Sequence, residues 1–353
     1  MKNFFFLFTV VGILVFLLLL PTKNYNNSAA SKSSSKFATP AEVEKALSRA
    51  FPNIPSKFNV THSAIILSML IDPTTDYKKC VDIIQTMSED LKIKIAGTTD
   101  PDTIVNSITN YFFTEKNFVY TETAKQYFSG TSTSLSIDDM KDFYSINRLL
   151  TNGTGTTLSF SIMYLIMGEK LSLPIYGAVS PERVYARYIT TGNAGITIEP
   201  TATGAEYSQP DETFFGAVDE TNKKIYGDNL GSLKVIGLYA YQAGMLFEMA
   251  DKTQQAFLCY KKAAEVNPDN ATIRFTLGEC YTKNKNPQQA EIEITAAVQL
   301  LPSNPIFHLA LAKLYLEEKH FLRAENECYE ALRLAPSDAE ANNLLEEIKN
   351  KNK

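Results

Sequence analysis

The sequence has few of the side chains that metal sites and thiol chemistry require. It contains four cysteines and three histidines, which are Cys80, Cys259, Cys280, Cys328, His62, His308 and His320. No two cysteines form a C-x-x-C pair, and the histidines are not spaced with them as zinc ligands usually are. We therefore predict no metal and no cofactor, and we interpret each cysteine as a small apolar side chain in a core.

Features of nucleic-acid and nucleotide binding are also missing. The formal net charge is -5, and no cluster of lysine and arginine with interleaved aromatic residues occurs. The glycines at 153 and 155 are not followed by the Gly-Lys-Ser/Thr ending of a phosphate-binding loop. We therefore expect no nucleic-acid partner, and we disfavour a nucleotide site.

The N-terminus carries an uninterrupted uncharged apolar run from Phe4 to Leu20. Its 17 residues exceed the roughly 7–15 of a signal-peptide core and reach the lower limit of the roughly 17–25 that cross a bilayer. We predict a transmembrane anchor over residues 1–21, with a cleaved signal peptide as the alternative. Lys2 is the only charge before the run, so we expect the rest of the chain on the extracytoplasmic side. Residues 22–39 are polar and are predicted to form a flexible linker.

A repeat marks the C-terminal part of the chain. Pro268, Pro302 and Pro336 are each 34 residues apart, which is the tetratricopeptide period. Small residues recur at the same spacing, where two antiparallel helices would approach closely. We predict three tetratricopeptide repeats with a terminal capping helix, an all-α solenoid over residues 237–353.

Six residues of the first helix of each repeat would face the concave groove. They are Tyr241, Met245, Phe275, Glu279, Leu309 and Lys313. Most are apolar, which favours an amphipathic helix or another peptide of a protein partner as the ligand. The alternative is that this groove packs on the preceding domain of the same chain.

Residues 40–230 change from helical to strand-like patterns along the chain. Apolar residues three and four apart predict helices over 40–51, 60–71, 74–96, 101–113 and 136–150, the last capped by Ser136. Short β-branched or aromatic segments over 173–179, 183–189 and 195–199 predict strands. We therefore predict an α+β domain.

The stretch NGTGTTLSFSIMYL at 152–165 leads from a glycine-containing loop into an apolar helix. It is followed by LSLPIYG at 171–177, PERVYARY at 181–188 and IEPT at 198–201. This order resembles the transglutaminase-like branch of the papain-type superfamily, in which a cysteine begins the central helix, a histidine begins a strand and an acidic residue ends the next strand. The resemblance places Thr157, Arg183 and Glu199 at these three positions.

Thr157 and Arg183 are poor substitutes for cysteine and histidine. The family's chemistry requires a thiolate beside an imidazole, whereas a threonine hydroxyl is far less acidic and arginine accepts no proton at working pH. We predict a catalytically inactive domain in which Thr156 or Thr157 caps the helix. Arg183 and Glu199 would then form an ion pair or an anion-binding pocket.

Two other functional interpretations stay open. In the first, the chain is an active hydrolase or acyltransferase that uses Thr157, Ser159 or Cys80 in an open cleft, or a displaced pair of His62 and Cys80. In the second, the repeats are purely structural and have no free groove. The leading hypothesis is a membrane-anchored interaction scaffold that binds a protein or peptide partner.

Overall fold

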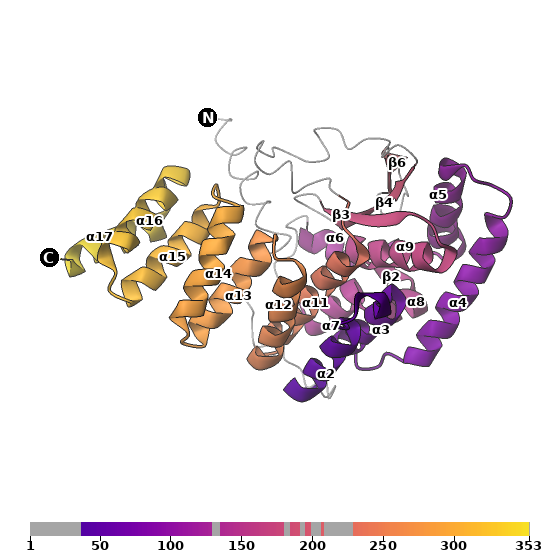
Figure 1. The fold of residues 1–353 in the computed structure, drawn as a ribbon, viewed down its shortest axis with the longest axis horizontal. Helices are drawn as coiled ribbons and strands as arrows, with labels where there is room; N and C mark the ends of the chain where they lie inside the picture. The colour runs from indigo at the N-terminus through magenta and orange to yellow at the C-terminus, as the bar shows by residue number, and fades with distance from the viewer. Residues whose placement is uncertain are drawn as a thin grey trace. The chain divides into compact units, whose positions relative to one another are not determined.

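The computed structural model describes residues 37–128, 135–179, 184–190, 195–198, 206–207 and 229–352, drawn as the coloured ribbon in Figure 1. The chain divides into two compact units, residues 1–259 and 260–353. The predicted transmembrane segment over residues 1–21 lies outside the described residues. Within the described part, no helix is both long and apolar enough to span a membrane.

The first unit begins with helices whose ends follow capping rules. They are α2 (Pro40–Ala50), η2 (Pro55–Lys57), α3 (Val60–Ile71), α4 (Tyr77–Lys94), α5 (Pro101–Asn110) and the π-helical η3 (Tyr111–Glu115). Thr39 and Glu42 form a capping box at the start of α2. Asn59, Asp76 and Asp100 each accept a backbone N–H bond at the starts of α3, α4 and α5. These polar residues fix where each helix begins.

The predicted single helix over residues 136–150 is wrong, because the structure divides it. Ser136 caps α7 (Ile137–Tyr144), and a second helix, α8, spans Ile146–Asn152. Ser145 lies between them with an extended backbone, and its hydroxyl accepts the N–H of Arg148. The same side chain is 1% exposed and bonds to the hydroxyl of Ser68 on α3 at 3.2 Å. The tertiary contact between Ser145 and Ser68 therefore stabilises the interruption between α7 and α8.

Short elements surround the central helix of the first unit. Strand β1 (Val119–Tyr120) pairs in parallel with β2 (Thr154–Gly155), and α6 spans Glu122–Phe128. Helix α9 (Thr157–Leu171) contacts α3, α4, α7, β3 and β4. Every residue from Leu158 to Gly168 is buried, so α9 is covered around its whole circumference, as expected of a core helix.

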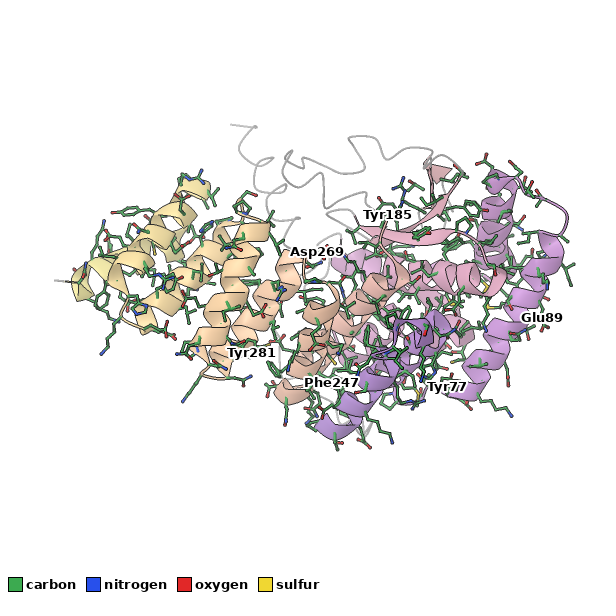
Figure 2. The ribbon with its side chains drawn as sticks, in the orientation of Figure 1. Tyr77, Glu89, Tyr185, Phe247, Asp269 and Tyr281 are labelled. Carbon is green, nitrogen blue, oxygen red and sulfur yellow. The ribbon has the colours of Figure 1, made fainter. Side chains whose placement is uncertain are left out.

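A four-stranded antiparallel sheet packs on α9. Its order is β3 (Ile175–Val179), β4 (Val184–Ile189), β5 (Gly195–Ile198) and β6 (Glu206–Tyr207). Ala186 pairs with Gly177 on one side and with Ile198 on the other. Tyr185 of β4, labelled in Figure 2, is fully buried. The three predicted strands are therefore present as adjacent antiparallel strands.

Helix α11 (Ser232–Met249) packs within the first unit against α3, α7, α9 and β3. The hydroxyl of Tyr239 donates to the carbonyl of Tyr144 at 2.5 Å. A β-carbon added to Gly177 would meet Val235 of α11, so the backbone of β3 approaches this helix closely. The sequence placed the domain boundary at residues 230–237, whereas these contacts assign α11 to the first unit.

The second unit begins within α12 (Thr253–Val266) and continues as an array of helix pairs. Helix α13 (Ala271–Lys283) packs on α14 (Pro287–Leu300), α15 (Pro305–Glu317) packs on α16 (Phe321–Leu334), and α17 (Ala339–Lys351) packs on α16. The turn residues Asp251, Lys285 and Lys319 all have positive φ and are 34 residues apart. The sequence period therefore recurs in the backbone.

Candidate functional site

The loop before α9 shapes the start of the helix. Gly153 has φ of 75° and ends α8, a conformation that favours glycine. A β-carbon on Gly155 would meet the hydroxyl of Ser159, which instead accepts the backbone N–H of Thr156 at 2.9 Å. Thr156 is the N-cap residue, and its hydroxyl donates to the carbonyl of Phe143 at 3.0 Å. The two glycines and Thr156 therefore serve the turn and the helix start.

The described elements next to the three predicted triad positions are α9, the start of β4 and the end of β5. Thr157 is the first residue of α9 and is partly exposed. One turn further along, Ser161 donates from its hydroxyl to the carbonyl of Val184 at 3.2 Å. Val184 begins β4, and the register of Ala186 with Ile198 places the end of β5 beside this point.

Arg183 and Glu199 themselves lie outside the described residues. Their predicted ion pair or anion-binding pocket therefore stays a prediction. Their described neighbours in sequence, Val184 and Ile198, lie at the sheet end that Ser161 of α9 contacts.

Two of the three alternative nucleophiles are enclosed. Ser159 is 1% exposed, and its hydroxyl donates to the carbonyl of Thr156 at 3.0 Å. The thiol of Cys80 is equally buried and donates to Oδ1 of Asn147 at 3.7 Å. Burial, with the charge of Asp76, raises the pKa of Cys80 to about 11. A thiol of this kind forms very little thiolate at neutral pH.

His62 and Cys80 do not form a pair. Nδ1 of His62 bonds to the hydroxyl of Tyr77 at 2.8 Å. Tyr77, labelled in Figure 2, is the first residue of α4. Burial and the charge of Arg49 lower the pKa of His62. The two residues that the displaced-pair hypothesis combines therefore have different partners.

An ion-pair network that joins the buried carboxylate of Asp72 to the partly exposed Arg148 and Asp142 beside the α7–α8 break was not predicted. The carboxylate of Asp72 is 1% exposed and accepts from Nε of Arg148 at 3.2 Å, while Nη1 of Arg148 donates to Asp142 at 2.5 Å. Burial alone would raise the pKa of Asp72, but hydrogen bonds from Thr74 and Arg148 outweigh it and lower the pKa. No sequence spacing signals this contact, because Asp72 follows the end of α3, whereas Asp142 and Arg148 lie on α7 and α8.

An open depression lies beside β1 and β2. It is lined by Val119, Tyr120, Thr121, Glu122, Thr123, Lys125, Asp142 and Thr154. None of Thr157, Ser159 and Cys80 contributes to this lining. Among the described residues, no group of three or more histidine, cysteine or acidic side chains is placed to hold a metal ion.

The six predicted groove residues differ in exposure. Tyr241, Met245, Phe275 and Leu309 are buried, at 9% exposure or less, whereas Glu279 is partly exposed and Lys313 is exposed. The ring of Phe275 stacks on Phe307 with centroids 4.6 Å apart, so it serves the packing of α13 on α15. Nζ of Lys313 pairs with Glu340 of α17 at 2.9 Å. As a ligand-binding set the six residues stay a prediction, and only Glu279 and Lys313 have appreciable exposure.

Comparison with known protein families identifies two regions. The transglutaminase-like superfamily matches residues 78–214, and a tetratricopeptide repeat matches residues 259–292. Both resemblances seen in the sequence are thereby confirmed at the level of the family. No curated protein matches the chain.

Solved structures similar to parts of the chain include helical-repeat proteins. The first TPR of Spaghetti (RPAP3), bound to HSP90 peptide SRMEEVD, is 23% identical with a TM-score of 0.32, covering 33% of this chain and 91% of that one. The Yersinia enterocolitica type III secretion chaperone SycD, in complex with a peptide of YopD, is 17% identical with a TM-score of 0.30, covering 32% and 92%.

Menin is similar over a longer stretch, with 12% identity and a TM-score of 0.49, covering 84% of this chain and 69% of that one. Residues 78–214 of the chain therefore match the transglutaminase-like superfamily, and residues 259–292, which follow them, match a tetratricopeptide repeat.

Proposed function

We propose that this protein is an interaction scaffold whose transglutaminase-like domain has no catalytic activity and whose repeats bind a peptide segment of a partner protein. The observation that carries the proposal is the residue at the start of α9. Thr157 is the first residue of this helix, where the family resemblance requires a cysteine.

Proton chemistry supports the loss of activity. A cysteine at a helix N-terminus ionises readily beside an imidazole, whereas a threonine hydroxyl keeps its proton unless a base removes it. The position that the resemblance assigns to the base is Arg183, whose guanidinium is not a proton acceptor. Loss of one triad member typically costs a factor of about 10⁴ in rate, and the members act as a unit.

The binding role is inferred from the repeat architecture. Stacked tetratricopeptide helix pairs form an extended surface that can bind a partner without any catalytic residue. On this surface Glu279 is partly exposed and Lys313 is exposed, so a peptide that carries complementary charges fits it best. We further propose that the apolar run from Phe4 to Leu20 anchors the chain, with its folded units on the extracytoplasmic side.

The catalytic half of the proposal is tested with the full chain in mild detergent. The protein is incubated with glutamine-containing acyl donors, ester substrates and a tagged amine, and intact-mass spectrometry searches for an adduct. We expect none, and Thr157→Ala should behave as the parent does. An acyl adduct or turnover that Thr157→Ala abolishes would overturn the proposal and favour a hydrolase or acyltransferase.

The binding half is tested on a peptide array, by comparing the parent with the double variant Glu279→Ala and Lys313→Ala. The matched control is Leu322→Ser, since Leu322 on the second helix of its pair is 72% exposed. We expect selected peptides to lose affinity for the double variant and to keep it for the control. Peptide binding that is unchanged in the double variant, or no peptide binding at all, contradicts the proposed groove.

A further inference from the structure

Arg274, near the start of α13, joins three parts of its repeat. Its Nε donates to the carbonyl of Pro268 in the turn before α13 at 3.0 Å, and its Nη1 donates to Oε2 of Glu293 on α14 at 2.8 Å. We call this arrangement the arginine clasp. The side chain of Glu293 is 11% exposed, so its ion pair with Arg274 is partly shielded from solvent.

His308 makes the same contacts in the next repeat. Its Nε2 is 3.0 Å from the carbonyl of Pro302, and its Nδ1 is 2.7 Å from Oε2 of Glu327 on α16. We call this arrangement the histidine clasp. Each of its three members lies 34 residues after the corresponding member of the arginine clasp. The repeat unit therefore builds one connection twice, with a different cation each time.

The corresponding positions of the preceding repeat carry no such connection. Ala240 and Cys259 stand 34 residues before Arg274 and Glu293, and both are fully buried. Neither side chain can form an ion pair. Two successive repeats thus share the connection and differ only in the chemistry of the cation.

Only a protonated ring satisfies both contacts of the histidine clasp. Both ring nitrogens of His308 face oxygen acceptors, one a carboxylate and the other a carbonyl. A neutral imidazole has only one N–H, so one nitrogen would then direct its lone pair at an acceptor. The imidazolium donates to both. Arg274 has no such dependence, because its guanidinium stays charged at any working pH.

We propose that the histidine clasp makes the stability of the third repeat (α15–α16) depend on pH, so that this repeat is more stable when the imidazole is protonated than when it is neutral. The arginine clasp makes no such contribution to the second repeat (α13–α14), whose stability should not depend on pH in this way. A rise in pH would then lower the stability of one repeat and leave the other unchanged. This effect lies within the second unit and is independent of which ligand the repeats bind.

Acidic side chains and a backbone carbonyl near His308 support the protonated form. Helix α16 contributes Glu327 in direct contact and Glu330 through space, and the turn after α14 contributes the carbonyl of Pro302. From α17, Glu340 is engaged by Lys313. The hydrogen bond to Glu327 raises the pKa of His308 above its usual 6.5, against the effect of burial.

The direction of the pH effect follows from linkage. A folded-state pKa above the unfolded value means that the folded chain holds the proton more tightly. The stabilisation is therefore complete below the unfolded pKa of 6.5 and is lost as the pH rises through the raised folded pKa. Each unit of difference between the two pKa values corresponds to about a tenfold change in the opening equilibrium of the repeat.

The test uses hydrogen exchange of the full chain in mild detergent, read by mass spectrometry on peptides of α13–α14 and α15–α16. Wild type and His308→Arg are compared at the same pH, which cancels the intrinsic effect of pH on exchange. At about pH 5.5 the two should exchange alike, since both carry a cation at this position. At about pH 8.5 the α15–α16 peptides of the wild type should exchange faster, by about tenfold for each unit of pKa difference.

The reciprocal variant Arg274→His should transfer the same pH dependence to α13–α14, and the peptides of the unmodified repeat serve as the internal reference. Exchange that is identical in wild type and His308→Arg at every pH overturns the proposal. A second measurement leaves the residues of both clasps unchanged. The ring of His308, assigned by NMR with His62→Gln and His320→Gln, should titrate above 6.5, and a midpoint at or below that value also overturns it.

Discussion

Replacing Glu169 by alanine should destabilise the first unit, because this side chain closes the N-terminus of α3 from the far end of α9. One carboxylate oxygen accepts the backbone N–H of Val60 at 2.7 Å. The other accepts from Nδ2 of Asn59 at 2.8 Å and from the hydroxyl of Thr61 at 2.9 Å. Val60 and Thr61 are buried, whereas Asn59 is exposed.

The magnitude follows from these contacts. A hydrogen bond to a charged acceptor contributes about 1.5–3 kcal/mol when buried, and a negative charge at a helix N-terminus adds about 0.3–1 kcal/mol. Water can replace the bond to Asn59, and the carboxylate is partly exposed, so the sum is reduced. We expect Glu169→Ala to lose about 2–3 kcal/mol and Glu169→Gln about 1 kcal/mol, since the amide keeps one acceptor oxygen.

The assay is urea unfolding followed by far-UV circular dichroism, with hydrogen exchange of the α3 amides to assign the loss to this contact. Lys170→Ala is the matched control, because Lys170 is the next residue of α9 and is exposed. That control should stay within about 0.5 kcal/mol of the parent. If Glu169→Ala is no less stable than Lys170→Ala, the reasoning is refuted.

Four further outcomes are expected. Gly278→Val should destabilise the second unit by about 1–3 kcal/mol, since an added β-carbon would lie 2.5 Å from Cγ1 of Ile294, and Ile294→Ala in the same chain should recover part of the loss in urea unfolding. Lys285→Gly should raise the midpoint of thermal unfolding, because a lysine with φ of 56° costs about 1 kcal/mol that glycine avoids. Cys80, with its pKa raised to about 11 by burial, should resist alkylation by iodoacetamide until the chain is unfolded, and fast labelling of the native protein would contradict its burial. Burial lowers the pKa of His62, so its contribution to stability is present above the unfolded value of 6.5 and is lost as the pH falls; thermal midpoints of His62→Gln should therefore decline less between about pH 7 and pH 5 than those of the parent.

The sequence alone determined features that depend on local patterns. The starts of α2 and α3 follow from Thr39 and Asn59 before amphipathic or apolar helices, and the repeat pairs follow from the 34-residue spacing of three prolines. The order of motifs around Thr157 predicted the family, and the family comparison confirms it. These signals are readable because capping, helical periodicity and repeat length act over a few neighbouring residues or recur unchanged.

Only the tertiary structure determined which distant residues the side chains of these helices contact. Ser145 breaks a helix whose pattern is continuous, because its hydroxyl contacts Ser68 from another helix. Helix α11 has the pattern of a repeat helix, yet the bond from Tyr239 to Tyr144 fixes it to the first unit. Phe275 occupies a groove position in the repeat pattern but packs on a neighbouring ring. In each case the deciding partner is distant in sequence, and the spacing of residues along a chain carries no information about which distant surface will cover them.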